Sequence, residues 1–138
     1  MNIDSIVNGV VIDHITAGQS LKLYNLLGLG ELKVPVALIT NAASGKRGAK
    51  DIIKIDADIP VDLDVIGYVD PGATVNFIRD GRVVEKRAIE LPETLTNVLK
   101  CKNPRCITTV EQELDQIFKL TDAKTKTYRC AYCEVKAE

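Results

Sequence analysis

The residues of this chain best suited to chemistry are its four cysteines, which form two close pairs near the C-terminus. Four residues separate Cys101 from Cys106, and two separate Cys130 from Cys133. Two such pairs, each in a short turn, can present four thiolates to one tetrahedral ion at about 2.3 Å. Zinc prefers soft, deprotonated sulfur ligands, so the pattern predicts one structural Zn²⁺ bound by all four cysteines. Because protein groups would fill every coordination position, we expect this metal to hold a shape and not to act on a substrate.

Two disulfides are the alternative use of these cysteines. The N-terminus carries neither the basic stretch nor the apolar stretch of a secretory signal, and a reducing cytoplasm keeps thiols unpaired. A redox Cys-x-x-Cys pair is expected near a βαβ pattern and at the start of a helix, whereas Cys130-Ala-Tyr-Cys133 lies almost at the end of the sequence. We therefore expect a cytoplasmic chain whose thiolates bind metal.

Length and composition limit the classes of function. The chain has 138 residues, of which 46% are hydrophobic, enough for one ordinary core and a small appendage. The net charge of −1 and the aromatic content of 4%, with no Trp, argue against a dominant nucleic-acid surface. No run approaches the ~18 apolar residues of a membrane span. We expect neither a membrane nor a nucleic acid as partner.

The hydrophobic pattern predicts the elements that must position these residues. Strands are expected over residues 10–15, 34–40, 50–56, 73–79 and 82–89, with one helix capped by Thr16 and a second with Pro60 in its first turn. Asp80-Gly81 predicts a tight hairpin. This order predicts an α+β fold: a ferredoxin-like βαββαβ domain with an added hairpin strand, followed by a small zinc-ribbon-like β domain. The predicted domains are residues 1–93 and 94–138, with residues 94–100 as a linker.

Four basic side chains of the first domain are candidates for binding an anion. Lys50 and Lys54 lie four residues apart in one predicted strand and therefore share a face, His14 ends the first strand, and Lys86 lies on the hairpin. If these strands are neighbours, the four could converge on a polyphosphate. Asp13 is expected on the opposite side of the strand from His14, where it could bind a sugar hydroxyl or orient a lysine. An ordinary solvated sheet face with a structural histidine remains the open alternative.

Catalytic constellations are scarce. The chain has one histidine, its cysteines all belong to the two pairs, and it contains no Gly-x-Ser-x-Gly. An enzyme needs a positioned acid, base or nucleophile, so we expect a protein that is not itself an enzyme.

Several segments taken together resemble a known family. They are Val11-Ile-Asp-His-Ile15, Gly48-Ala-Lys-Asp-Ile-Ile-Lys-Ile55, Ala73-Thr-Val-Asn76, Leu91-Pro-Glu93 followed by Asn97-Val-Leu99, and the Cys-x4-Cys and Cys-x2-Cys-Glu module. Each segment alone is weak evidence for a family, but the occurrence of all of them in the same order is specific. Across nearly its whole length the sequence resembles the regulatory chain of aspartate carbamoyltransferase.

The resemblance implies a noncatalytic regulatory subunit of pyrimidine biosynthesis. Its first domain would bind CTP as inhibitor and ATP as activator and would form a homodimer, and its second domain would hold zinc and dock on the catalytic chain. The dimers would bridge catalytic trimers. At matching positions the resemblance assigns Asp13, Lys50 and Lys54 to the ribose and base, His14 and Lys86 to the phosphates, Ile6 and Val83 to the base pocket, and Asn76 to the phosphate side. It assigns the four cysteines to zinc, and it places Asn103, Arg105 and Glu134 beside the catalytic chain.

Two other functions are weighed against this one. The cysteine module could belong to a zinc-ribbon protein that binds nucleic acid or takes part in transcription. From Val98 to Glu138, however, eight Lys or Arg stand against six Asp or Glu, and a net charge of +2 is a weak footprint for that role. A small independent enzyme is disfavoured because nucleophile and base are lacking.

Overall fold

The protein was analysed as a computed structural model that describes residues 6–45, 48–111 and 113–137. It divides into two compact units, Met1–Glu90 and Leu91–Glu138, which are described separately below. Among the described residues, no helix combines the length and the apolar character that crossing a bilayer requires.

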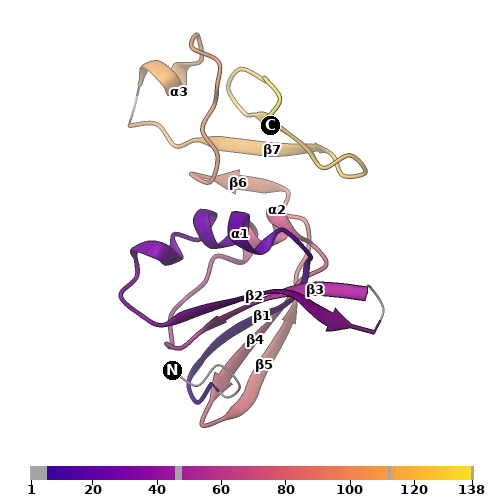
Figure 1. Cartoon of the computed structure of the whole chain (residues 1–138). Coiled ribbons are helices and arrows are strands. Elements are labelled where there is room, and N and C mark those ends of the chain that lie inside the picture. The colour runs from indigo at the N-terminus through magenta and orange to yellow at the C-terminus, as the bar shows by residue number, and fades with distance from the viewer. Residues whose placement is uncertain (1–5, 46–47, 112, 138) are drawn as a thin grey trace. The chain divides into compact units, whose positions relative to one another are not determined.

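Unit 1 is built on one five-stranded antiparallel sheet (Figure 1). Its elements are β1 (Gly9–Thr16), α1 (Ser20–Leu26), the 3₁₀ helix η1 (Leu29–Glu31), β2 (Val36–Ser44), β3 (Gly48–Ile55), α2 (Leu63–Val69), β4 (Thr74–Arg79) and β5 (Arg82–Ala88). The strand order β2-β3-β1-β4-β5 is the ferredoxin-like order with β5 added at one edge. The predicted α+β class is confirmed.

The core of unit 1 lies on one face of this sheet. Alternate strand residues are fully buried there, namely Val10, Ile12, Ile53, Ile55 and Val75. The helices α1 and α2 cover this face and add Leu23, Val65 and Ile66 (Figure 1). Burial of each such side chain stabilises the fold by about 1.5–3 kcal/mol. The opposite face of the sheet is free of these helices, and it is called the open face below.

A β-bulge interrupts β1. Ile12 and Ile15 are both fully buried although they lie three positions apart, an odd spacing that a regular strand would send to opposite faces. The pairing with β3 accounts for this, because Ile12 faces Ile53 and Ile15 faces Asp51. One extra residue is therefore accommodated in β1 between them, and His14 has a φ of +58°.

Asp51 is a fully buried carboxylate that ties three segments together. It accepts hydrogen bonds from the backbone N–H groups of Gly18 at 2.9 Å, Ser20 at 3.2 Å and Asn41 at 3.0 Å. Burial raises its pKa, but hydrogen bonds from Ser20, Asn41 and Gly18 outweigh burial and leave the pKa below its usual value. Asp51 thus satisfies donors at the start of α1. The prediction that Thr16 caps this helix is wrong, because the helix begins at Ser20.

The second helix also begins later than predicted. Its N-cap is Asp62, whose carboxylate accepts the N–H groups of Asp64 at 3.0 Å and Val65 at 3.4 Å. Pro60 precedes this cap and does not occupy the first turn, because an Asp that can accept these orphan donors fixes the helix start two residues further on.

The segment before β1 is held against the sheet. The carbonyl of Val7 accepts the N–H of Gly81 at 2.9 Å. Gly9 lies at a close approach to two neighbours: a Cβ there would lie 2.2 Å from the carbonyl oxygen of Ile55 and 2.7 Å from Cγ2 of Ile6. Only glycine fits this position without displacing its neighbours.

Unit 2 contains β6 (Thr94–Thr96), a short helix α3 (Ile107–Val110), β7 (Ile117–Asp122) and β8 (Thr127–Cys130). The three strands form one antiparallel sheet in the order β6-β7-β8, as expected for a small β domain next to a cysteine module. The predicted linker over residues 94–100 is wrong in its first part. Leu95 is fully buried opposite Phe118, and this contact makes residues 94–96 a strand.

Candidate functional site

The open face of unit 1 gathers the predicted anion-binding residues in rows across the strands. Lys54 of β3 pairs with Val11 of β1, Val11 pairs with Asn76 of β4, and Asn76 pairs with Lys86 of β5. We call these four residues the lysine row. Directly paired residues point to the same side of a sheet, and neighbouring strands are about 4.8 Å apart, so the row spans about 14 Å.

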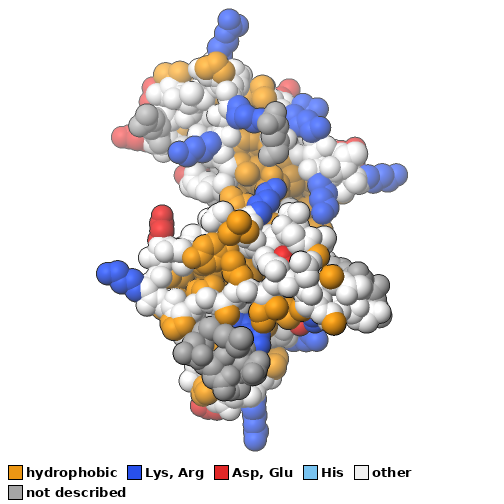
Figure 2. Space-filling model, viewed as in Figure 1, with side chains coloured by type: hydrophobic (Ala, Val, Ile, Leu, Met, Phe, Trp, Pro, Cys, Tyr) orange, Lys and Arg blue, Asp and Glu red, His pale blue; other side chains and the backbone are white. Residues whose placement is uncertain are grey.

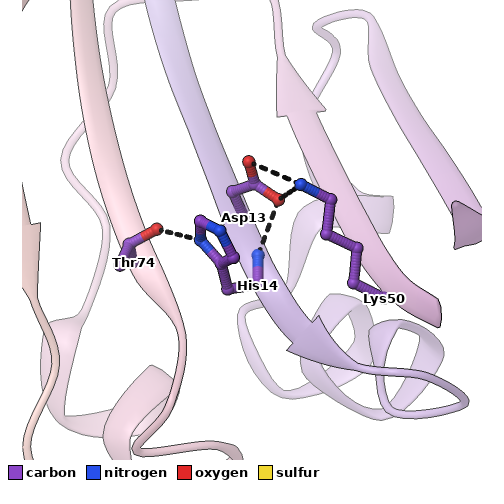
Figure 3. A network of polar contacts seen from close by, with 4 residues as sticks. All are labelled: Asp13, His14, Lys50 and Thr74. Atoms are coloured by element: carbon purple, nitrogen blue, oxygen red, sulfur yellow. Dashed lines mark hydrogen bonds and ion pairs between the residues drawn. The ribbon is translucent and has the colours of Figure 1, made fainter. Parts of the chain in front are cut away.

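A second group lies beside the lysine row, near the bulge of β1 (Figure 3). The Nζ of Lys50 lies 3.0 Å and 3.3 Å from the two carboxylate oxygens of Asp13. The Nδ1 of His14 lies 3.0 Å from the hydroxyl of Thr74, the residue paired with Asp13 across the sheet. We call Asp13, His14, Lys50 and Thr74 the charged cluster.

The expected separation of Asp13 and His14 to opposite sides is wrong. Asp13 contacts Lys50 and is paired with Thr74, and the ring of His14 also contacts Thr74 (Figure 3), because the bulge interrupts the strict alternation of the strand. The backbone N–H of His14 also donates to the Asp13 carboxylate at 2.6 Å. Asp13 forms an ion pair with Lys50, a contact compatible with orienting a lysine, and both roles foreseen for Asp13 remain predictions.

The Asp13 carboxylate is held in its ionised form. Burial raises its pKa. The hydrogen bond from Lys50, the hydrogen bond from the backbone N–H of His14 and the charge of Lys50 together lower the pKa by more than burial raises it, so the net shift is downward. The resulting ion pair fixes the direction of the Lys50 side chain, which is half-buried.

A pocket of about 510 Å³ opens beside the charged cluster. Its lining consists of His14, Ala43, Ser44, Gly45, Lys50, Gly72 and Thr74. Sequence reasoning missed Thr74 and the small residues at the end of β2. The available signal was the run Asn41-Ala-Ala-Ser-Gly45, which offers a hydroxyl and exposed backbone beside the strand that carries Lys50.

The two predicted apolar contacts lie at the hairpin end of the sheet. Val83 pairs with Ile78, which pairs with Gly9, and Ile6 packs against Gly9. Ile6 is buried whereas Val83 is 57% exposed. The structure therefore brings Lys54, Asn76 and Lys86 into one row and His14 with Lys50 into one pocket, and it places Ile6 and Val83 near the opposite end of the same strands.

The four cysteines of unit 2 converge, and their sulfur atoms all lie within 4.8 Å of one another. The two shortest contacts join one residue of each pair: Cys101 to Cys133 at 3.4 Å and Cys106 to Cys130 at 3.6 Å. A disulfide requires about 2.05 Å, so these are free thiols. Four sulfurs arranged around a tetrahedral ion at about 2.3 Å would be about 3.8 Å apart, so the cluster fits such an ion.

Neighbouring donors prepare part of this cluster for ionisation. The N–H of Val135 lowers the pKa of the Cys133 thiol to about 6, and the hydroxyl of Thr108 lowers that of Cys106. Burial raises the pKa of Cys101 to about 12 and also raises that of Cys130. The surroundings thus shift the pKa of Cys106 and Cys133 toward the thiolate and that of Cys101 and Cys130 away from it. A nearby positive charge such as a metal ion favours the thiolate form of all four.

The three residues assigned to a subunit surface lie around the cysteine turns. The side chain of Asn103 accepts the N–H of Arg105 at 3.0 Å, and its carbonyl accepts the N–H of Cys106 at 3.0 Å, so Asn103 shapes the first turn. Arg105 and Glu134 are exposed.

Comparison with known proteins divides the chain in nearly the same place as the structure does. Residues 1–90 match the family described as aspartate carbamoyltransferase regulatory chain, allosteric domain. Residues 93–138 match its metal binding domain. The second match and the four convergent sulfurs together show a metal-binding domain with a cysteine cluster.

Individual relatives cover nearly the whole chain. The aspartate carbamoyltransferase regulatory chain of Clostridium acetobutylicum is 49% identical over 134 residues, which cover 97% of this chain and 92% of the relative. That of Bifidobacterium longum is 46% identical over 138 residues, covering 100% and 99%. That of Clostridium tetani is 44% identical over 135 residues, covering 97% and 94%. The chain therefore belongs to the family of aspartate carbamoyltransferase regulatory chains, which are noncatalytic.

Proposed function

We propose that the open face of unit 1 binds nucleoside triphosphates as allosteric effectors, with CTP as inhibitor and ATP as activator. The observation that carries this proposal is the convergence of His14, Lys50, Lys54 and Lys86 on one face of one sheet. Basic side chains at this spacing suit a polyphosphate. The pocket beside the charged cluster supplies a recess for part of the ligand.

The proposed roles are those that the family resemblance implies, and they draw on both the lysine row and the charged cluster. Asp13, Lys50 and Lys54 serve the ribose and base, His14 and Lys86 serve the phosphates with Asn76 beside them, and Ile6 and Val83 line the base pocket. The Asp13–Lys50 ion pair supports this arrangement because it fixes the direction of one lysine before any ligand binds.

For unit 2 we propose one structural Zn²⁺ held by Cys101, Cys106, Cys130 and Cys133. Four sulfur donors within 4.8 Å of one another support zinc, which prefers tetrahedral thiolate sites. The ion holds the two cysteine turns in place, and the surface they form docks on the catalytic chain through Asn103, Arg105 and Glu134.

In this proposal the effector site and the active site lie on different chains. Coupling then requires an assembly with two quaternary states that bind the nucleotide with different affinity. Regulatory chains pair through unit 1, and the resulting homodimers bridge catalytic trimers in the cytoplasm, in the pyrimidine pathway that the enzyme's name indicates.

Calorimetry on the isolated, metal-loaded chain tests the effector site. CTP and ATP are titrated into the wild type, Lys54→Ala and Lys86→Ala. We expect each variant to bind at least about tenfold more weakly, because each loses a charge-assisted hydrogen bond. Lys33→Ala removes an exposed lysine that precedes β2 and serves as the matched control. Unchanged affinity in both site variants would remove these lysines from the effector site.

A further inference from the structure

A row of basic side chains crosses the small sheet of unit 2. Thr94 of β6 pairs with Lys119 of β7, Lys119 pairs with Arg129 of β8, and Arg129 forms an antiparallel bridge with Lys136. We call Lys119, Arg129 and Lys136 the basic row. No role assigned above uses these three residues.

The basic row faces away from the interior of unit 2. The neighbouring strand positions carry the buried residues of this unit, Leu95, Phe118 and Cys130, and strand residues alternate between faces. The three basic residues are all exposed. Figure 2 shows that Lys and Arg side chains also stand out on the visible surface of unit 2.

The charges of the basic row are not neutralised within the described residues. The ion pairs found there join Asp13 to Lys50 and Asp58 to Arg79, both in unit 1. Within the row, Arg129 donates to the backbone carbonyl of Glu134 at 3.1 Å. Like charges placed directly opposite one another destabilise a sheet, so the stability of unit 2 does not explain the row.

The surface around the row is open, and its acidic neighbours include Glu134 and, in a second depression that Lys119 also lines, Glu93. A shallow depression of about 530 Å³ is lined by Lys119, Thr121, Arg129, Cys130, Ala131 and Glu134. Small side chains between the cations leave a broad contact face, which fits a protein surface better than an enclosed small ligand. Glu134 also belongs to the proposed docking surface of the cysteine turns, so the basic row continues that surface.

We propose that the basic row docks on an acidic surface of the catalytic chain and steers the association of the two chains. This inference rests on the regulatory function proposed above and adds a charged face to the cysteine turns. Complementary charges at an interface raise the association rate and fix its register, and salt weakens both effects over a screening length of about 8 Å at physiological ionic strength.

Assembly with the cognate catalytic trimer tests this proposal. Metal-loaded wild type, Lys119→Glu, Lys136→Glu and the double variant are mixed with the trimer at several salt concentrations, and affinity and association rate are measured. We expect about tenfold weaker assembly or more in the double variant, and a flatter dependence on salt. Lys124→Glu reverses one exposed charge in the turn between β7 and β8, outside the row, and should change affinity by less than about twofold.

Zinc content and thermal unfolding of each variant show whether unit 2 is intact. An intact double variant that assembles like the wild type, with the same salt dependence, would overturn the proposal and leave the regulatory role standing. A wild type that fails to assemble would overturn both. A fluorescent single-stranded oligonucleotide is tested in parallel: binding that the double variant loses while its assembly is unchanged would assign the row to nucleic acid and also overturn the proposal.

Discussion

The two units of this chain are held together in different ways. Unit 1 buries a continuous apolar layer between its sheet and two helices, and within that layer Val10, Ile12, Ile53, Ile55 and Val75 are fully inaccessible. Unit 2 buries few large side chains, chiefly Leu95, Phe118 and Tyr128, and sets four cysteines beside them. Domains this small cannot bury enough apolar surface, and a metal commonly supplies the missing stability.

Because of this difference, the residues proposed to bind ligand in unit 1 are not the residues that stabilise it, whereas in unit 2 the same cysteine turns serve both stability and the proposed docking. In unit 1 the core occupies one face of the sheet, so the lysine row and the charged cluster on the open face can be changed with little effect on folding. In unit 2 the cysteine turns carry both the metal and the proposed docking surface. Substitutions can therefore break or sharpen the contrast between the units.

The largest effect is expected from removing one metal ligand. Cys106→Ser should release the metal and unfold unit 2, because binding of a structural zinc contributes about 10–16 kcal/mol to folding at neutral pH, while unit 1 keeps its fold. Metal analysis and amide NMR spectra of the two units provide the measurement. Tyr132→Ser changes an exposed side chain between two ligands and should retain the metal. Full metal content in Cys106→Ser would show that the cluster is not the binding site.

Truncation of a core side chain of unit 1 should destabilise unit 1 and leave unit 2 and its metal unchanged. Ile53→Ala creates a cavity beneath the sheet and should destabilise unit 1 by about 2–5 kcal/mol, with the metal of unit 2 retained. Chemical denaturation followed through unit 1 signals measures the change. Leu21→Ala, at a side chain that is 59% exposed, should change stability by less than about 0.5 kcal/mol. Loss of metal in Ile53→Ala would mean that the units do not fold independently.

A smaller effect is expected from adding one methyl group at Gly9, where a Cβ has no room. Gly9→Ala places a Cβ 2.2 Å from the Ile55 carbonyl, so the segment before β1 must shift, and we expect a loss of about 1–3 kcal/mol. Gly45→Ala adds the same group where no heavy atom beyond the adjacent residues of the chain lies within 4 Å, and it serves as the control. Equal thermal stability of the two variants would contradict the close approach at Gly9.

The smallest effect concerns pH. The pKa of Asp13 is lowered in the folded state, so its ionised form stabilises unit 1 above the unfolded value of about 3.9, and this contribution is lost as the pH falls through the lower folded value. Asp13→Asn should therefore be less stable than wild type at pH ~7, and the gap should narrow on acidification.

The control is an ion pair exposed to solvent. Asp58→Asn breaks the ion pair with Arg79. The Asp58 side chain is 58% exposed and that of Arg79 is 64% exposed, so the change in the free energy of unfolding should stay near zero at every pH. Denaturation curves at pH ~7 and pH ~3 compare the variants. A gap for Asp13→Asn that widens in acid would contradict the direction of the pKa shift.

Much of the fold followed from the sequence because its causes are local. Alternating β-branched residues marked the strands of unit 1, and the spacing of Cys101, Cys106, Cys130 and Cys133 marked the cluster. The misses came from contacts between distant segments. Residues 94–96 became a strand through Phe118, and the start of α1 was set by Asp51, which lies on β3.

The candidate site was predicted residue by residue but not in its geometry. Strict alternation separated Asp13 from His14, whereas the bulge brings them together. One clue was present in the sequence: Ile12 and Ile15 are both suited to a core but have an odd spacing. The roles of all the effector-site residues, and those of Asn103, Arg105 and Glu134, depend on ligands and partners, and they remain predictions.

The bulge in β1 makes the charged cluster depend on chain length as well as on side-chain identity. Deletion of one codon, that of either Asp13 or His14, would give β1 the same number of residues as its partner between Ile12 and Ile15. Both isoleucines would still face the core, and the sheet could close without the irregularity. The product would be a folded regulatory chain with an incomplete charged cluster, so a single in-frame deletion offers a short mutational path by which the proposed effector site could be lost while the fold is kept.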